Sequence, residues 1–186
     1  MMKNKLGVIH GRFQGLHLGH LEFLLEAFNR SEFVYIGISN PDPLLSKKDK
    51  ADLKRSKEIS NPFTFFDRLQ MIKGSLLDEG LGENRFTIVP FPISYPELIE
   101  YYVPKDATYH LTIYDEWGEK KLATLKELNL ETDVMWRRTM EDRFTTGSEV
   151  RNKIANNMEW SHLVPSYVYN YIRKNRLNEI VIKLNK

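Results

Sequence analysis

Two histidines, an arginine and three glycines stand close together near the start of the chain, in Gly11-Arg12-Phe13-Gln14-Gly15-Leu16-His17-Leu18-Gly19-His20. A short apolar run at residues 6–9 precedes this stretch, and apolar residues three or four apart follow it up to Phe28. The pattern predicts a buried strand, a turn and a helix. The first turn of a helix offers free N–H groups and a positive dipole to a phosphate. We therefore expect an anion site here, with His17 and His20 on one side of the helix.

Other kinds of site fit this stretch less well. A zinc site needs three or four protein ligands, but the chain has no cysteine and its other histidines carry no ligand spacing. We therefore expect no metal held by the protein. The glycine spacings of the dinucleotide fingerprint and of the P-loop are absent. A plainer alternative is that both histidines cap the helix and face solvent. We favour imidazole groups that stabilise charge on a transferring phosphoryl group.

A second group of anion-binding residues lies far along the chain, in Thr145-Thr146-Gly147-Ser148-Glu149-Val150-Arg151. Hydroxyls and a glycine are typical of a helix start, and Arg151 follows Ser148 by three residues. Hydroxyls, free N–H groups and a guanidinium together predict a second phosphate site.

Five apolar runs alternate with helical patterns, which predicts a parallel α/β sheet with right-handed crossovers. The expected strands are residues 6–9, 33–38, 86–91, 109–114 and 132–136. Ligands of such sheets bind at the carboxyl edge. Asp115 and Trp117 follow the fourth strand, so they are positioned to contact a ligand; Trp117 packing on the next helix, residues 120–128, is the alternative.

The segment between the second and third strands holds further candidates. Residues 44–60 are polar and rich in lysine; they are interpreted as a solvated loop, with a basic lid over phosphates as the other hypothesis. Asn61 is the expected cap of the next helix and Pro62 its first residue. Arg68 falls on the first turns of that helix, where it either reaches the sheet edge or makes a surface salt bridge.

Composition sets the remaining bounds. The 186 residues suit one domain, and 41% hydrophobic and 28% charged residues are ordinary for a globular protein. A net charge of +2 does not predict a nucleic-acid partner. No apolar run approaches the roughly 18 residues of a membrane helix, so we expect no membrane association and a cytoplasmic location.

The two groups together resemble the HxGH nucleotidyltransferases, and most of all the nicotinamide-mononucleotide adenylyltransferases of the archaeal type. Gly11-Arg12-Phe13-Gln14 followed by His17-x-Gly19-His20 matches the first motif of that family. Thr146, Ser148 and Arg151 take the places of its Ser-x-Thr-x-x-Arg motif. Gly15 stands where the family has proline, and tyrosines such as Tyr95 stand where it has a tryptophan that stacks on nicotinamide.

The resemblance implies a Rossmann-like sheet of five parallel strands in the order 3-2-1-4-5, with a C-terminal helical cap at residues 146–186. It implies adenylyl transfer from ATP, with Mg2+, to a mononucleotide phosphate such as nicotinamide mononucleotide, and a homo-oligomeric protein. The implied catalytic residues are His17, His20 and Arg151. The expected nucleotide-binding residues are Gly11, Arg12, Phe13, Gln14, Gly19, Thr146 and Ser148. The expected acceptor-binding residues are Asn61, Arg68, Tyr95, Asp115 and Trp117.

Two other functions stay open at this point. One is the same chemistry with another base or acceptor, as in a cytidylyltransferase or a phosphopantetheine adenylyltransferase. The other is a module that senses a nucleotide without turnover. A class I aminoacyl-tRNA synthetase is disfavoured, because the chain has no room for a tRNA-binding domain.

Overall fold

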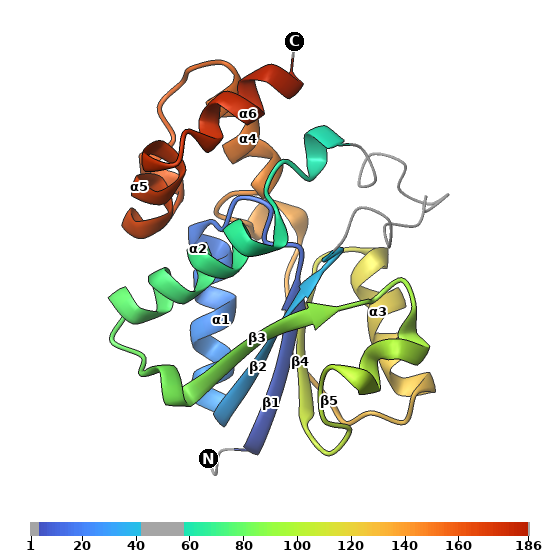
Figure 1. Ribbon diagram of the computed structural model, residues 1–186. Coiled ribbons are helices and arrows are strands. Elements are labelled where there is room, and N and C mark those ends of the chain that lie inside the picture. The colour runs from blue at the N-terminus through green and yellow to red at the C-terminus, as the bar shows by residue number, and fades with distance from the viewer. Residues whose placement is uncertain (1–3, 42–57, 186) are drawn as a thin grey trace. The chain divides into compact units, whose positions relative to one another are not determined.

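The computed structural model describes residues 4–41 and 58–185 (Figure 1). The hypothesised lid at residues 44–60 lies outside these ranges, except for its last three residues. The described chain divides into two compact units, each built from segments that are far apart in the sequence. The first unit holds residues 4–11, 22–40 and 82–143, and the second holds residues 12–21, 41, 58–81 and 144–185.

The first unit contains a parallel sheet with the strand order β3-β2-β1-β4-β5. The predicted order 3-2-1-4-5 and the Rossmann-like fold are therefore confirmed. The strands are β1 (Asn4–Gly11), β2 (Ser31–Ser39), β3 (Phe86–Phe91), β4 (Thr108–Ile113) and β5 (Thr132–Arg137). Each is within two residues of the predicted run at both ends, because a buried parallel strand reads as a continuous apolar segment.

Two helices cover opposite faces of this sheet. Phe86 packs edge-on against Phe28 of α1 (Leu18–Arg30). Phe91 packs in a cluster that includes Leu125 of α3 (Glu116–Glu127). Because side chains alternate along a strand, residues five apart point to opposite faces. Figure 1 shows α1 and α3 on the two sides of the sheet accordingly.

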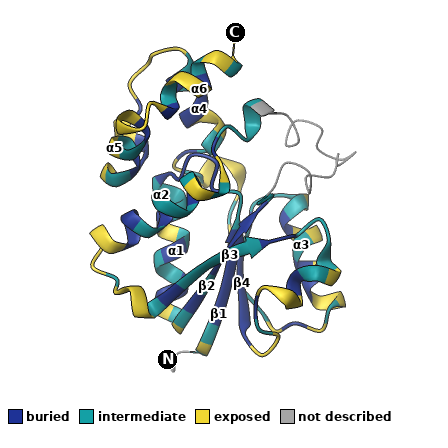
Figure 2. Cartoon of the chain, viewed as in Figure 1, coloured by how far each residue is buried: buried dark blue, intermediate teal, exposed yellow. Residues whose placement is uncertain are grey.

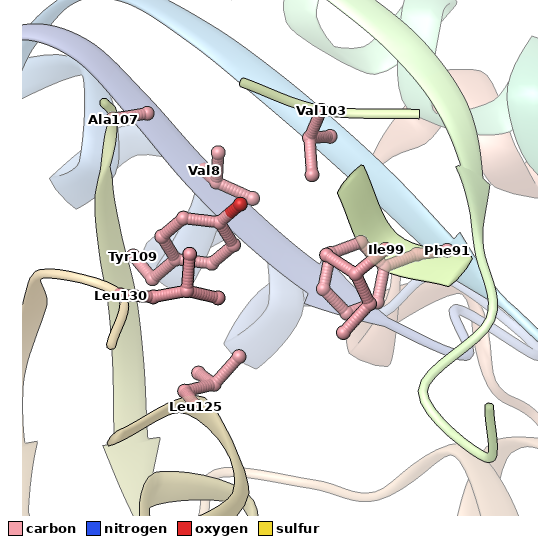
Figure 3. Close-up of a cluster of buried hydrophobic side chains, with 8 residues drawn as sticks. All are labelled: Val8, Phe91, Ile99, Val103, Ala107, Tyr109, Leu125 and Leu130. Carbon is pink, nitrogen blue, oxygen red and sulfur yellow. The ribbon is translucent and has the colours of Figure 1, made fainter. Parts of the chain in front are cut away.

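The core on the α3 face is an apolar cluster drawn in Figure 3. It contains Val8, Phe91, Ile99, Val103, Ala107, Tyr109, Leu125 and Leu130. In Figure 2 the central strands are dark blue toward their carboxyl halves, where residues 7–10 of β1 and 36–39 of β2 are buried. The carboxyl ends of the strands are thus held on a rigid base.

The second unit is helical. Its helices are α2 (Phe65–Asp78), α4 (Gly147–Ala155), α5 (Ser166–Lys174) and α6 (Leu177–Leu184). Helix α5 packs on α2, and the missing side chain at Gly74 leaves room for the ring of Tyr167. The predicted helical tail is confirmed, although α6 was not predicted as a separate helix.

Short 3-10 helices join these elements: η2 (Glu58–Ser60), η3 (Glu83–Arg85), η4 (Pro96–Tyr101), η5 (Met140–Asp142) and η6 (Ser161–Leu163).

The start of α2 differs from the prediction. Asn61 does not cap this helix and Pro62 is not its first residue; Thr64 is the cap. The Thr64 hydroxyl accepts from the Asp67 N–H at 3.1 Å, and the Asp67 carboxylate accepts from the Thr64 N–H at 3.0 Å. This reciprocal capping box satisfies two backbone donors, whereas a lone cap at Asn61 would satisfy one.

A buried polar network ties three strands and α1 together. The His110 ring is 2.8 Å from the Ser31 hydroxyl through Nε2 and 2.9 Å from Asp133 through Nδ1. Arg30 donates to the same carboxylate at 3.1 Å. The order of groups is that of a Ser-His-Asp triad, but Ser31 is 0% exposed, so no substrate reaches its hydroxyl. The network is therefore structural.

We expect Ser31→Ala to lower the free energy of unfolding by about 1–3 kcal/mol, because it leaves His110 Nε2 buried without its partner. Urea denaturation at pH 7.5 measures the change. Ser161→Ala, at an exposed serine, is the matched control and should stay within about 0.5 kcal/mol of wild type. Equal effects of the two variants would contradict a structural role for the network.

Two buried histidines make stability depend on pH. Burial lowers the pKa of His110, against the opposite effect of Asp133, and burial with the charge of Lys121 lowers the pKa of His10 well below its ordinary value. Below about pH 6.5 the unfolded chain binds protons at both histidines before the folded chain does. The free energy of unfolding should therefore fall between pH 7 and pH 5, by up to about 1.4 kcal/mol per pH unit for each histidine.

A series of urea denaturation curves across this range tests the expectation. Carboxylates whose pKa is lowered in the folded state, such as that of Asp142, lose stability only at more acidic pH, so they do not mimic the effect. A flat profile between pH 7 and pH 5 would show that neither histidine is held neutral.

Candidate active site

The motif loop, residues 12–17, runs from the residue after β1 to the residue before α1 in the sequence and belongs to the second unit. Phe13 and Gly15 have φ values of 50° and 80°, and the side chains of Phe13 and Leu16 are fully buried. Proline cannot adopt a positive φ. Gly15, at the position where the adenylyltransferases have proline, therefore marks a turn of different backbone shape.

Gln14 anchors this loop through both ends of its amide. Its Nε2 donates to the Phe63 carbonyl at 3.0 Å, and its Oε1 accepts from the Phe63 N–H at 3.0 Å. The side chain is buried. Its amide thus holds the loop against the segment before α2, which is a different contribution from the nucleotide contact expected of it.

Two buried arginines donate to carbonyls of the same loop. Arg68 of α2 is 2% exposed and its Nη1 donates to the Arg12 carbonyl at 2.9 Å. Arg151 of α4 is 6% exposed and its Nη1 donates to the Gln14 carbonyl at 2.7 Å. The alternative of a surface salt bridge for Arg68 is therefore wrong, because the side chain is inside the unit.

Burial also lowers the pKa of both guanidinium groups. It lowers the pKa of Arg68 to about 10, with a further lowering by the charge of Arg12, and lowers the pKa of Arg151 to about 10. Both remain charged near pH 7. A buried positive charge in a low-dielectric setting attracts an anion strongly, so these arginines also make the loop electropositive.

The two motif histidines are stacked on each other at the start of α1. Their ring centroids are 3.7 Å apart and their planes differ by 24°. His17 precedes the helix, and its Nδ1 accepts from the His20 N–H at 3.3 Å. A Cβ at Gly19 would lie 3.2 Å from His17 Nδ1, so glycine leaves room for this ring. Because Nδ1 accepts, the neutral His17 ring carries its proton on Nε2 and can donate it to a phosphate.

The second motif forms the start of α4. Thr146 caps the helix, and its hydroxyl accepts from the Glu149 N–H at 3.1 Å. The Ser148 hydroxyl accepts from Arg151 Nη2 at 3.2 Å. A Cβ at Gly147 would lie 2.8 Å from the Gln14 carbonyl oxygen. The glycine thus brings the N-terminus of α4 against the motif loop.

The second unit therefore brings both motifs together, with Arg12, Phe13, Gln14, His17, Gly19, His20, Asn61, Arg68, Thr146, Ser148 and Arg151 all within it. Imidazole N–H, guanidinium and helix N-terminal N–H groups converge on one loop. These are the donors that a polyphosphate requires.

The remaining predicted residues lie in the first unit. Gly11 ends β1, and Tyr95 directly precedes η4. Asp115 caps α3 by accepting from the Gly118 N–H at 3.0 Å, and Trp117 lies in the first turn of that helix. Helix α3 thus begins at Glu116, four residues earlier than predicted, because the Asp115 cap was not recognised.

A shallow, open depression lies at the carboxyl ends of β4 and β5. It is lined by Ile113, Tyr114, Asp115, Glu116, Glu119, Arg137, Arg138, Thr139 and Asp142. Arg138 lies over the Trp136 ring at 4.3 Å and pairs with Glu22 at 3.0 Å. Of the residues that line this depression, Asp115 alone was predicted to contact a ligand.

Within residues 4–41 and 58–185, no group of three or more acidic, histidine or cysteine side chains is placed to hold a metal ion. None of the helices in these same ranges has the length and apolar character needed to cross a membrane.

Comparisons with known proteins agree with this geometry. Residues 8–176 match the Cytidylyltransferase-like family. The chain is 46% identical over 173 residues to a phosphonoformate cytidylyltransferase of Streptomyces viridochromogenes, with 93% of each chain covered. It is 30% identical over 182 residues to a nicotinamide-nucleotide adenylyltransferase of Saccharolobus solfataricus, covering 94% of this chain and 96% of the relative.

A solved structure gives the same fold. A bifunctional NMN adenylyltransferase/ADP ribose pyrophosphatase from Francisella tularensis superposes with a TM-score of 0.69 at 18% identity. The match covers 98% of this chain and 54% of the other, so the chain spans about half the length of that protein. The two sequence motifs, the sheet order and these matches lead to one conclusion: the chain belongs to the cytidylyltransferase-like family of HxGH nucleotidyltransferases.

Proposed function

We propose that this nucleotidyltransferase transfers a cytidylyl group from CTP to the phosphonate group of a small acid such as phosphonoformate and releases pyrophosphate. The observation that carries the proposal is the 46% identity, over 93% of both chains, to a phosphonoformate cytidylyltransferase. The expectation of nicotinamide mononucleotide as acceptor is not confirmed, and the cytidylyltransferase alternative has the better support.

Several residues support a departure from the adenylyltransferases. Gly15 has a φ of 80°, which the proline of those enzymes cannot adopt. Tyrosines such as Tyr95 replace the tryptophan that stacks on nicotinamide in those enzymes. These changes fall mostly where an acceptor ring would be recognised, whereas the phosphate-binding motifs are kept.

The proposed reaction is a direct in-line displacement. A phosphonate oxygen of the acceptor forms a bond to the α-phosphorus of CTP, while the bond from that phosphorus to the α,β-bridging oxygen breaks and pyrophosphate leaves with the electron pair. His17, through Nε2, and His20 stabilise charge on the α-phosphate. Thr146, Ser148 and Arg151 bind the β- and γ-phosphates at the N-terminus of α4.

Mg2+ enters this scheme with the nucleotide. Magnesium is commonly held by substrate phosphates and water with few protein ligands. The acids and histidines of the described ranges form no cage of their own for it. Bound to the triphosphate, the ion would neutralise charge on the leaving pyrophosphate.

Pyrophosphate release with purified protein tests the assignment. CTP and ATP are each combined with phosphonoformate, nicotinamide mononucleotide, nicotinate mononucleotide and phosphopantetheine. The expected result is the highest kcat/KM with CTP and phosphonoformate. Highest turnover with ATP and nicotinamide mononucleotide would overturn it in favour of the second candidate, which the 30% identical relative supports. Nucleotide binding without turnover in every combination would support a sensing module.

The histidine pair gives a specific test of the mechanism. His20→Ala should lower kcat about 100- to 1,000-fold, because it removes one preorganised donor from the transition state. His162→Ala, at an exposed histidine of the helical tail, is the control and should leave kcat unchanged. Circular dichroism checks that both variants are folded. If His20→Ala keeps more than about a third of wild-type turnover, His20 is not a catalytic residue.

A further inference from the structure

Three of the described helical segments begin with the same local pattern, a threonine followed three residues later by an acid. In a capping box, such an acid folds back onto the backbone of the capping residue. The pairs are Thr64–Asp67 at α2, Thr139–Asp142 at η5 and Thr146–Glu149 at α4. The local sequence therefore predicts the same closed arrangement at all three.

The first two pairs are closed. The Asp67 carboxylate accepts from the Thr64 N–H at 3.0 Å and from the Thr64 hydroxyl at 2.6 Å. The Asp142 carboxylate accepts from the Thr139 N–H at 2.6 Å and from the Thr139 hydroxyl at 2.9 Å. In both pairs the acid takes both hydrogen-bond donors of the capping threonine.

The pair at α4, which is labelled in Figure 1, is open. The Thr146 hydroxyl accepts from the Glu149 N–H at 3.1 Å, but the Glu149 carboxylate accepts from the Thr145 hydroxyl at 2.9 Å. Within the described part of the chain, this carboxylate accepts from neither the N–H nor the hydroxyl of Thr146. Thr146 thus keeps two donors that the capping threonines of α2 and η5 lose to an acid.

Burial of Thr145 explains where the Glu149 carboxylate lies. Thr145 is 4% exposed, whereas Glu149 is exposed. A buried hydroxyl needs a hydrogen-bond partner inside the protein, and a charged acceptor gives a stronger hydrogen bond than a neutral one. The buried hydroxyl therefore decides the position of the exposed carboxylate.

This position matters because the start of α4 carries the second motif. Arg151 is 6% exposed and donates through Nη2 to the Ser148 hydroxyl at 3.2 Å. The proposed function places the β- and γ-phosphates at these groups and at Thr146. A carboxylate closed onto Thr146 would occupy two of the donors and repel the phosphates.

We propose that Thr145 is a positioning residue: its hydroxyl holds the Glu149 carboxylate away from Thr146, so that the N–H and O–H of Thr146 bind the terminal phosphates of the nucleotide. The proposal rests on the proposed function for the place of these phosphates and adds a residue that touches none of them. Thr145, Thr146 and Glu149 all lie within the second unit.

Thr145→Val tests the role of the hydroxyl, because it nearly keeps the size of the side chain. The Kd for inorganic pyrophosphate, measured by calorimetry with Mg2+, and the KM for CTP should each rise about 10-fold, as expected when donors to a charged group are lost. The Kd for CMP, which lacks the β- and γ-phosphates, and the KM for the acceptor should change less than about twofold. Thr145→Ser, which keeps the hydroxyl, should stay close to wild type.

Thr124→Val is the matched control. The Thr124 hydroxyl in α3 donates to the Lys120 carbonyl at 3.0 Å, outside both motifs. This variant should leave the Kd for pyrophosphate unchanged.

Glu149 variants test the route by which Thr145 acts. Glu149→Asp gives α4 the threonine–aspartate pattern of the two closed pairs, and the exposed position tolerates the change. It should raise the Kd for pyrophosphate as Thr145→Val does, whereas Glu149→Ala should leave this Kd equal or lower. The double variant Thr145→Val/Glu149→Ala should match Glu149→Ala, because the hydroxyl acts only through the carboxylate.

Several results would overturn the proposal. Equal losses in Thr145→Val and in the double variant would show that the hydroxyl acts without Glu149. An unchanged Kd for pyrophosphate in Thr145→Val and Glu149→Asp, or no pyrophosphate binding by the wild-type protein, would also overturn it. If Thr145→Val is unfolded, Glu149→Asp and Glu149→Ala decide the question.

These titrations separate the proposal from the proposed function. Pyrophosphate binding needs neither an acceptor nor turnover. If no pair of nucleotide and acceptor gives turnover, the proposed function fails; if pyrophosphate still binds to wild type and Glu149→Asp weakens it, the role of Thr145 stands.

Discussion

The candidate site depends on the anchoring of one loop. Arg68 and Arg151 donate hydrogen bonds to carbonyl oxygens two residues apart in the motif loop. The Gln14 side-chain amide makes two hydrogen bonds to the backbone of Phe63. Charge-assisted hydrogen bonds of this kind are about twice as strong as neutral ones. They hold a backbone with positive φ values at Phe13 and Gly15, which an isolated loop would not keep. The backbone of the motif loop is therefore held in place by contacts within the chain.

In this arrangement the arginines both anchor the motif loop and place positive charge beside it. Each guanidinium has five N–H groups in a fixed fork, and Arg151 uses Nη1 for the Gln14 carbonyl and Nη2 for the Ser148 hydroxyl. The same charge that stabilises the loop lies beside the start of α4. Preorganised positive groups in a buried setting act on a phosphate more strongly than exposed ones, because little reorganisation is needed when charge develops.

The two buried histidines of the sheet differ in their partners. Both ring nitrogens of His110 have hydrogen-bond partners, in Ser31 and Asp133, so this histidine has a structural role. His10, at the carboxyl end of β1, has an apolar stacking partner instead. Burial alone does not separate these two histidines, since both are nearly inaccessible; the presence or absence of hydrogen-bond partners does.

The sequence by itself determined the approximate extents of the five strands and the family, because strands follow from local periodicity and the family from residue types at short spacing. The strand order was predicted through the resemblance to that family. The sequence did not determine the start of α2, where Asn61 and Thr64 both suit a cap and the reciprocal contact with Asp67 decides. Only the tertiary structure decided what Arg68 and Arg151 touch. Their carbonyl partners lie 56 and 137 residues away, and every residue has a carbonyl, so no pattern of side chains marks the one that a buried guanidinium will find.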